Sequence, residues 1–387
     1  MTKMKNAERL NEIAPSGIRK LFSRAQGIPG VISLGIGQPN IPTPKGLVER
    51  VVQLIEGGDN YYSPTPGTKI FREGVAEQNK RDYNLDYDPN NQILATASGC
   101  EALYCSLMSF VDPGDEVLIP DPSFLTYPRQ AMLAGGKPVW MKPTKELKID
   151  TSNLQEYITD RSKAIILNFP SNPTGEIMTT SELKPIIDLA IDNDLIILTD
   201  EVYEKCIFTD DKHIRVSKLA GAYERTLLLN SFSKTLCIPG WRLGYAAGPK
   251  EMIAQMTKMH SFIVANAPSA QQNAVGKFIN TTEFDVFTNK LRDILKERMI
   301  KIVKGFNSID GFSCRKPEGS FYAFPRTTFH KDYTTSNELS ETIFEKQKIV
   351  LVPGTEFGPS GEGHLRASFG SITLDQIDEV MTRLKEL

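Results

Sequence analysis

The sequence is poor in cysteine and histidine, and this scarcity excludes several kinds of site. The five cysteines are odd in number and scattered, and no two of them form a C-x-x-C pair. We therefore expect free thiols, with neither a disulfide framework nor a zinc site. The four histidines form no H-E-x-x-H arrangement, which removes the commonest metallo-hydrolase interpretation, so no metal is expected. The cysteines are Cys100, Cys105, Cys206, Cys237 and Cys314.

An excess of charge of one sign is also missing. The chain carries 45 Lys and Arg against 47 Asp and Glu, a net charge of −2. It therefore lacks the excess of positive charge that is typical of proteins that bind nucleic acid. No stretch approaches the ~18 to 20 uninterrupted apolar residues of a membrane span. Residues 1–6 lack the apolar core of a signal peptide. We expect a cytoplasmic protein whose partners include neither nucleic acid nor membrane.

Internal repeats and low-complexity linkers are absent, and the chain instead alternates between two patterns. Apolar runs of strand length are separated by stretches with helical periodicity. Strands that are apolar on both faces indicate a largely parallel sheet covered by helices, which is an α/β fold. Polar clusters follow these runs, as they do where ligands bind at the carboxyl ends of strands. The runs are residues 116–119, 164–167, 195–198 and 226–229.

The length of 387 residues exceeds the size at which one core stops growing, so we expect two domains. Residues 46–280 form the large domain in this division. Residues 281–387 form a smaller domain of helices and strands, with a charged amphipathic stretch at 280–307, short strands near 319–324 and 349–352, and a last helix from Leu374. Residues 1–45 are expected to associate with the small domain and the mouth of the site.

A dinucleotide-binding site is the first kind of ligand site to consider, and residues 33–40 do not meet its requirements. Residues 33–40 contain G-x-G, but Asn40 stands where the third glycine should fall. Proline-rich coil follows this segment, where a Rossmann site needs a helix.

Lys234 has the most informative setting in the chain. It is flanked by Ser231, Ser233 and Thr235, and Arg242 follows eight residues later. An aldehyde cofactor that carries a phosphate needs an amine for a Schiff base, together with serine and arginine donors for the phosphate. The pattern predicts pyridoxal 5′-phosphate (PLP) as cofactor.

Three further segments carry chemistry that suits this cofactor. Ser98, Gly99 and Cys100 open a helical stretch, where glycine lets backbone N–H groups approach an anion. Asp200 ends a buried strand and needs a cationic partner, which the pyridinium nitrogen supplies. Asn172 lies between prolines in a turn that fixes its amide, and Asn172-Pro173 is a plausible cis bond.

Together these segments resemble the class I/II aminotransferases, the fold type I PLP enzymes, over almost the whole chain. The similarity is closest to the subgroup of bacterial and archaeal aspartate and aromatic aminotransferases. The resemblance implies a large domain with a mostly parallel central sheet, a smaller α+β domain, and a homodimer whose site is completed across the interface. It implies catalytic roles for Lys234, Asp200 and Tyr203, and binding of PLP by these three and by Ser98, Gly99, Cys100, Phe124, Asn172, Ser231, Ser233, Arg242 and Tyr62.

The resemblance also implies how substrate binds and reacts. Arg366 corresponds to the arginine that binds the substrate α-carboxylate in bidentate fashion, and Gly37 and Asn172 contact the same group. Lys234 acts as the base that removes the Cα proton, with ping-pong transfer of the amino group to a 2-oxo acid, 2-oxoglutarate by analogy. Tyr62 corresponds to a tyrosine that reaches the phosphate in the neighbouring subunit.

The sequence determines the amino donor less well than it determines the cofactor. Enzymes specific for dicarboxylates place an arginine shortly before an Asn-x-Pro element, whereas Ser261, beside His260, stands there in this sequence. This departure favours aromatic or broad substrates over aspartate, with Ile18 as an apolar cover of the site. Two alternatives remain: a C–S β-lyase on the same fold, and a non-catalytic aminotransferase-like sensor.

Overall fold

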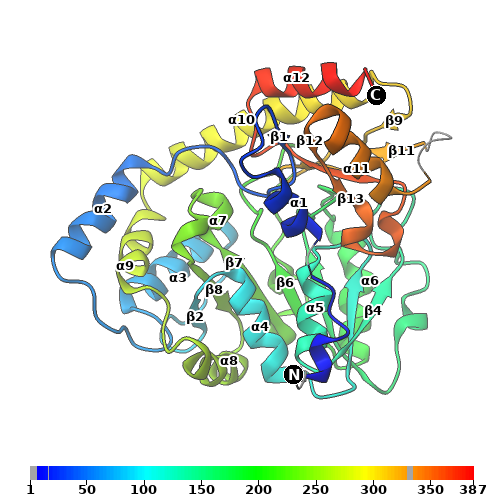
Figure 1. Ribbon diagram of the computed structural model, residues 1–387. Helices are drawn as coiled ribbons and strands as arrows, with labels where there is room; N and C mark the ends of the chain where they lie inside the picture. The colour runs from blue at the N-terminus through cyan, green and yellow to red at the C-terminus, as the bar shows by residue number, and fades with distance from the viewer. Residues whose placement is uncertain (1–6, 16, 329–333) are drawn as a thin grey trace, which may run out of the picture.

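The computed structural model describes residues 7–15, 17–328 and 334–387, without the side chains of residues 18–20 and 22 (Figure 1). Within these residues the largest sheet has seven strands in the order β2-β8-β7-β6-β5-β3-β4. Its strands are β2 (Ile93–Thr96), β3 (Glu116–Pro120), β4 (Lys137–Met141), β5 (Ser162–Asn168), β6 (Ile196–Asp200), β7 (Thr226–Ser231) and β8 (Gly244–Ala247). Every pairing in it is parallel except the two made by β8. The predicted mostly parallel sheet is confirmed.

The central strands are apolar on both faces because helices cover both faces. Ile166 on β5 packs into a cluster with the inner faces of α4, α5 and α8. Its neighbours Ile165 and Leu167 point the opposite way, into a cluster with α6. This is why residues 164–167 read as a continuous apolar run rather than an alternating one.

The helices around the sheet have defined bounds, and several begin at side-chain caps. Thr179 and Glu182 form a capping box at the start of α6, and Thr68 caps α3. The helices are α1 (Gly17–Ala25), α2 (Lys45–Glu56), α3 (Lys69–Tyr83), α4 (Gly99–Phe110), α5 (Thr126–Leu133), α6 (Thr180–Asp192), α7 (Phe232–Thr235), α8 (Lys250–Ile263) and α9 (Ser269–Phe278). Among the described residues, no helix combines the length and apolarity needed to cross a membrane.

The C-terminal part of the chain contributes further helices and short strands outside the seven-stranded sheet, at the top of Figure 1. The long helix predicted for 280–307 and the final helix predicted from Leu374 are confirmed. Its helices are α10 (Thr282–Phe306), α11 (Ser336–Gln347) and α12 (Leu374–Leu384). Its strands are β9 (Phe312–Ser313), β10 (Tyr322–Ala323), β11 (Arg326–Thr327), β12 (Ile349–Val350), β13 (Val352–Pro353) and β14 (Leu365–Ser368).

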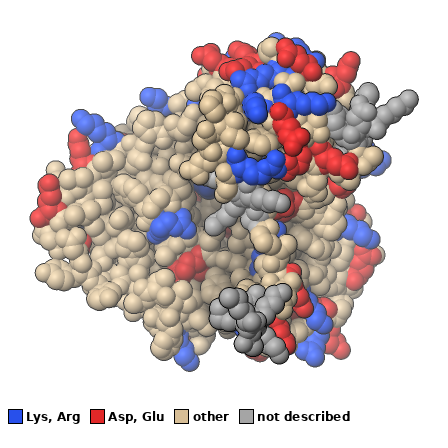
Figure 2. Space-filling model, in the orientation of Figure 1, with Lys and Arg blue, Asp and Glu red and all other residues tan. Residues whose placement is uncertain are grey.

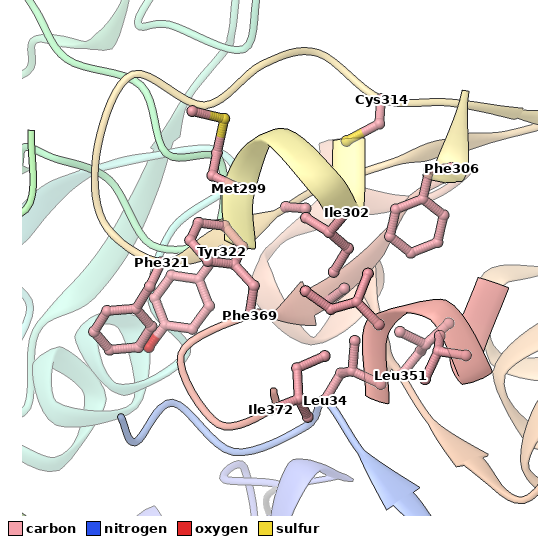
Figure 3. Close-up of a cluster of buried hydrophobic side chains, with 14 of the residues drawn as sticks. Leu34, Met299, Ile302, Phe306, Cys314, Phe321, Tyr322, Leu351, Phe369 and Ile372 are labelled. Carbon is pink, nitrogen blue, oxygen red and sulfur yellow. The ribbon is translucent and has the colours of Figure 1, made fainter. Parts of the chain in front are cut away.

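A hydrophobic cluster packs these helices and strands together, and Figure 3 shows part of it. The cluster also includes Tyr203 and Phe208 from the segment that follows β6. Met299 and Ile302 of α10 pack there with Phe321 and Phe369. Leu34, from the N-terminal segment, belongs to the same cluster. Strand β1 (Ile32–Ser33) pairs in parallel with β12 and not with a strand of the seven-stranded sheet.

Candidate active site

The carboxyl ends of three neighbouring parallel strands bring the predicted residues together. Asn168 ends β5, Asp200 ends β6 and Ser231 ends β7, with Asn168 directly opposite Asp200 in the ladder. A cavity of about 480 Å³ opens at this edge. The predicted residues that line it are Gly37, Ser98, Gly99, Cys100, Phe124, Asn172, Asp200, Tyr203, Ser231, Ser233, Lys234, Arg242 and Arg366.

Lys234 enters the cavity from α7, the single turn that follows β7. Its Nζ donates to the backbone carbonyl of Gly37 at 2.5 Å. Burial disfavours the charged amine and lowers the pKa of Lys234 to about 8. The positive charges of Arg366 and Arg242 lower this pKa further, while Asp200 opposes them. A lysine in this setting is a far better nucleophile and base near neutral pH than a solvated one.

Asp200 faces the same cavity with a pKa shifted in the opposite direction. Burial raises the pKa of its carboxyl to about 6. The Tyr127 hydroxyl donates to Oδ2 at 2.8 Å, and the backbone N–H of Val202 makes a longer bond of 3.4 Å to Oδ1. Above pH 6 the group is a half-buried anion that faces the cavity.

An anion site lies at the N-terminus of α4. Ser98, the residue before the helix, has φ of 100°, and Ser98, Gly99 and Cys100 all line the cavity, so the first turn of the helix borders it. The guanidinium of Arg242 donates to the Ser98 hydroxyl at 2.7 Å. The hydroxyls of Ser231 and Ser233 lie 2.8 Å apart on the facing turn. Backbone donors, hydroxyls and a guanidinium form the donor set that a phosphate requires.

Gly244 makes the close approach between these turns possible. A Cβ on Gly244 would lie 2.6 Å from the carbonyl oxygen of Asn230 and 2.8 Å from the backbone nitrogen of Gly99. Gly244, two residues after Arg242, therefore lets β8 lie against the anion-binding turn.

Arg366 on β14 brings a guanidinium to the other end of the cavity. It is 2% exposed, and its planar group lies between the rings of Tyr322 and Phe357, with centroids at 4.5 and 4.7 Å. One terminal nitrogen donates to Asn172 Oδ1 at 3.0 Å and the other to the Gly35 carbonyl at 2.7 Å. Its Nε has no hydrogen-bond partner among the described residues. A buried arginine with spare donors suits an anionic ligand such as a carboxylate.

Two residues that the sequence did not single out hold this geometry. Asn168 donates from Nδ2 to the Asp200 carbonyl at 2.8 Å and accepts from the Asn172 N–H at 2.9 Å, so one side chain joins both turns. The Asn172-Pro173 bond is cis, as the sequence suggested. Tyr322 lies 2.9 Å from the Tyr203 hydroxyl, and its own hydroxyl occupies the space that a Cβ on Gly37 would need.

The sequence carries only weak signals for Asn168, Tyr322 and Tyr127, none of which the sequence analysis singled out. Tyr127 stands three positions after Phe124 at the start of a helix, and Asn168 ends a strand, which is the position of Asp200 on the next strand. Tyr322 lies in a segment that the sequence analysis treated only as a strand. Tyr127, Tyr322 and Asn168 each bond to a residue that is distant in the chain, Asp200, Tyr203 and Asp200 respectively, and local spacing does not mark these pairs.

Other expected residues lie outside the cavity of their own chain. Tyr62 is 90% exposed. Ser261 is exposed on α8 and donates to the Lys258 carbonyl. His260 is buried against Glu101, which also accepts from the Cys105 thiol at 2.8 Å. The side chain of Ile18 lies outside what the structure describes.

The site therefore combines a lysine of lowered pKa, a buried carboxylate, a phosphate-type anion site and a carboxylate-type arginine in one cavity. This is the equipment of an enzyme that works on amino acids through a phosphorylated aldehyde cofactor.

Comparison with known proteins identifies the class. The sequence matches the family "Aminotransferase class I and II" over residues 29–384. It is 37% identical to the aspartate aminotransferase of Pyrococcus abyssi, over 99% of this chain and 98% of that protein. It is also 37% identical to aromatic-amino-acid aminotransferase 2 of Thermococcus litoralis, over 98% of this chain and 97% of that one.

A solved structure agrees with these sequence relatives. The aromatic aminotransferase of Pyrococcus horikoshii superimposes with a TM-score of 0.89 and 34% identity, covering 95% of this chain and 98% of that one. The chain belongs to the class I and II aminotransferases, a family of PLP-dependent enzymes with the type I fold. It is an enzyme that transfers amino groups.

Proposed function

We propose that this aminotransferase binds PLP in the 480 Å³ cavity and transfers the amino group of an L-amino acid, aromatic donors included, to a 2-oxo acid. The observation that carries the proposal is the convergence of Lys234, Asp200 and Arg366 on one cavity. The first two have pKa values displaced in opposite directions, which is the usual sign of groups that exchange or stabilise protons and charge.

The residues present fit the cofactor. Gly99, Cys100, Ser231 and Arg242 would hold the phosphate at the N-terminus of α4, with Ser98 and Ser233 supporting them, because their donors converge there. Phe124 offers a ring face to the pyridine, Asp200 its anion to the ring nitrogen, and Asn172 and Tyr203 their polar groups to the phenolic oxygen. When bound, PLP supplies a protonated ring that withdraws electrons from the substrate Cα.

The protein's own groups would then move the protons. Lys234 Nζ, neutral above its pKa of about 8, would take the proton from the substrate Cα and deliver it to the cofactor's aldehyde-derived carbon, on the other side of the amino nitrogen. Arg366 binds the α-carboxylate and so orients the Cα–H bond toward Nζ. Asp200, negatively charged above pH 6, would stabilise the positive charge of the ring.

The cavity supports a donor with an uncharged side chain. Its lining contains three cations within the described residues, Lys234, Arg242 and Arg366, and each already has a role. None remains for a second carboxylate inside one chain. We infer that tyrosine or phenylalanine serves at least as well as aspartate, with 2-oxoglutarate as acceptor by family resemblance.

A homodimer is part of the proposal. An apolar face, defined by the exposed residues Val48, Val52, Ile55, Tyr61, Tyr62, Phe262, Ile263 and Val264, runs over α2, the loop after it and the end of α8. In Figure 2 the surface over α9 is mostly uncharged, and charged side chains stand at the outer left edge, over α2. Exposed apolar groups on this scale favour burial against a second copy. Tyr62 and Ser261 would then complete the partner's site.

The division of the chain also stays a proposal. Residues 46–280 would move as the large domain and 281–387 as the small one, with 1–45 following the latter. The shared cluster of Leu34 with residues of α10 and the pairing of β1 with β12 support this assignment of the first 45 residues.

A panel of half-reactions tests the function. The purified enzyme, loaded with PLP, is mixed with one L-amino acid at a time, and the cofactor absorbance and the released 2-oxo acid are followed. We expect stoichiometric conversion with aromatic donors and recovery of the starting spectrum on adding 2-oxoglutarate. Ammonia and pyruvate released without an oxo acid would instead identify a lyase. Binding without conversion of any donor would identify a sensor.

A further inference from the structure

Tyr127 is a buried polar group that the proposed roles above leave unused. Its side chain is 1% exposed, yet it lines the cavity. The hydroxyl donates to Asp200 Oδ2 at 2.8 Å, while among the described residues the other carboxylate oxygen has only the long 3.4 Å contact with the Val202 N–H. Tyr127 therefore provides the shorter of the two hydrogen bonds that hold this carboxylate.

The turn that carries Tyr127 also carries the ring-stacking residue. Phe124 lies three positions earlier, and the two rings pack edge to face with centroids 5.6 Å apart. Tyr127 sits in the first turn of α5, where its N–H bonds to the Phe124 carbonyl at 3.0 Å. One short segment thus places an aromatic face and a hydroxyl donor beside the same cavity.

This segment is anchored from a distant part of the chain. Both carboxylate oxygens of Asp121 accept from the Ser360 N–H, at 3.1 and 3.0 Å. The Ser123 N–H donates to the Phe357 carbonyl at 2.7 Å. The turn before Tyr127 is therefore fixed at two points, and the hydroxyl is held in place before any ligand arrives.

We propose that Tyr127 is a positioning residue: it holds the Asp200 carboxylate charged and oriented toward the ring nitrogen of the cofactor. The proposal rests on the proposed PLP chemistry for its meaning, but the hydrogen bond itself belongs to the protein without cofactor.

The direction of the effect follows from the chemistry of the pair. A phenol donates a stronger hydrogen bond to a carboxylate than to a neutral acid, so the bond favours the charged form. It opposes burial, which by itself raises the pKa of Asp200, and Glu201 raises that pKa as well. Lys234 lowers it from across the cavity. The pKa of Tyr127 itself lies well above its usual value because of burial and the adjacent Asp200, so the phenol stays a donor.

Tyr127→Phe and a matched control separate this role from simple packing. The variant removes one oxygen and keeps the ring against Phe124. Tyr87→Phe makes the same change at a tyrosine that is 4% exposed, bonds to Ser217 Oγ at 3.0 Å and lies outside the cavity. Both variants lose a buried hydrogen bond, so a general loss of stability affects both.

The decisive measurement is the titration of the Asp200 carboxyl in the protein without cofactor, by carbon-13 NMR, with Asp200→Asn used to assign the signal. We expect Tyr127→Phe to raise its midpoint by about one pH unit, the size typical of a lost charged hydrogen bond, and Tyr87→Phe to leave it unchanged. In the holoenzyme, kcat should fall about tenfold for Tyr127→Phe with KM within twofold.

A midpoint in Tyr127→Phe that coincides with the wild type would overturn the proposal. So would an equal shift in both variants, because that would reflect a general structural effect. Failure of the wild-type protein to bind PLP would instead defeat the proposed function, and the carboxyl titration would still report on Tyr127.

Discussion

At the scale of single residues, one physical cause gives the site its chemistry. Burial disfavours charge of either sign, so it lowers the pKa of Lys234 to about 8 and raises that of Asp200 to about 6. Neighbouring groups then adjust each value. Tyr127 lowers the pKa of the carboxyl, and Arg366 lowers that of the amine.

Replacing Lys234 by alanine should abolish turnover while PLP still binds. The contacts at the phosphate site and at Asp200 survive, but the base that moves the Cα proton is lost, which corresponds to several orders of magnitude in kcat. Turnover is measured with a sensitive coupled assay and binding by equilibrium dialysis. Near-normal turnover, after removal of contaminating wild-type enzyme, would refute the role of Lys234.

The lowered pKa of Lys234 also predicts a stability effect in the protein without cofactor. Its folded pKa of about 8 lies below the value of 10.5 assigned to the unfolded chain, so between these values the unfolded state binds more protons. Unfolding free energy from this group therefore rises from pH 8 to 10.5, and the cost of the buried charge is fully present below pH 8.

Lys234→Met should accordingly raise the thermal midpoint of the apoprotein at pH 7. The gain should shrink as the pH rises through 8 toward 10.5, because the wild-type amine then loses its charge. Thermal unfolding curves of both proteins across this range check the prediction. A gain that is independent of pH would show that better packing by methionine, not relief of a buried charge, is responsible.

Arg366→Leu should lower kcat/KM by a similar large factor for every amino donor. In the proposed function Arg366 binds the α-carboxylate, which all donors share, and loss of a buried charged hydrogen-bond pair costs a factor of order 10² or more. Tyrosine, phenylalanine, aspartate and leucine are compared as donors in steady-state assays. A loss confined to one donor class would show that Arg366 binds the donor's side chain and not its α-carboxylate.

The measured donor preference can contradict the proposal that the cavity has no cation left for a second carboxylate. Wild-type kcat/KM for aspartate that exceeds the value for phenylalanine by more than about a thousandfold would require a cation beyond the three in the lining. Changes at Ser261 would then report whether a second copy supplies part of that pocket, since Ser261 lies outside the cavity of its own chain.

At the scale of elements, short turns after parallel strands create the site. Strands β5, β6 and β7 end side by side, and the residues after them turn toward the cavity. Antiparallel β8 returns beside β7 and presses its first residue, Gly244, against the turn before α4. The phosphate-type site thus depends on close contact between two turns, because neither turn alone supplies all of its donors.

Gly244→Ala should damage that contact, and Gly240→Ala is its control within the same motif. The added Cβ at 244 would lie 2.6 to 2.8 Å from backbone atoms that cannot yield, whereas no described atom lies within 4 Å of a Cβ at 240. We expect destabilisation of about 1 to 3 kcal/mol and at least tenfold weaker PLP binding for Gly244→Ala. Gly240→Ala should stay close to wild type.

Denaturant unfolding and PLP titration measure the two effects. Equal behaviour of the two alanine variants would show that the approach of β8 to the α4 turn does not limit cofactor binding.

At the scale of the whole molecule, we expect the apolar face to be the dimer interface. Val52 on α2 is 45% exposed in the middle of this face, and Ile300 on α10 is 53% exposed outside it. Val52→Asp should shift the protein from dimer toward monomer and reduce activity, because a charge buried in an interface is costly. Ile300→Asp should retain the dimer.

Light scattering coupled to size-exclusion chromatography gives the mass directly. A wild-type protein that is monomeric at micromolar concentration, or a Val52→Asp variant that remains dimeric and fully active, would reject this face as the interface.

Much of the fold and of the site could be predicted from local pattern. The apolar run 164–167 indicated a strand buried on both faces, and the charged repeat after 280 indicated a long helix, because each signal lies within one element. Ser98, Asp200, Ser231 and Lys234 were found because each stands at a fixed offset from a strand in its own short motif.

The sequence alone therefore determined the fold class, the amine, the carboxylate and the anion-binding turn, since contiguous residues encode them. The tertiary structure decided what distance in the chain conceals: Tyr127 meets Asp200 across 73 positions, Tyr203 meets Tyr322 across 119 and Arg366 meets Asn172 across 194. It also decided that Ser261 and Tyr62 face outward. A pair that forms only when separate elements pack leaves no mark in local spacing, because packing, not propensity, selects its partner.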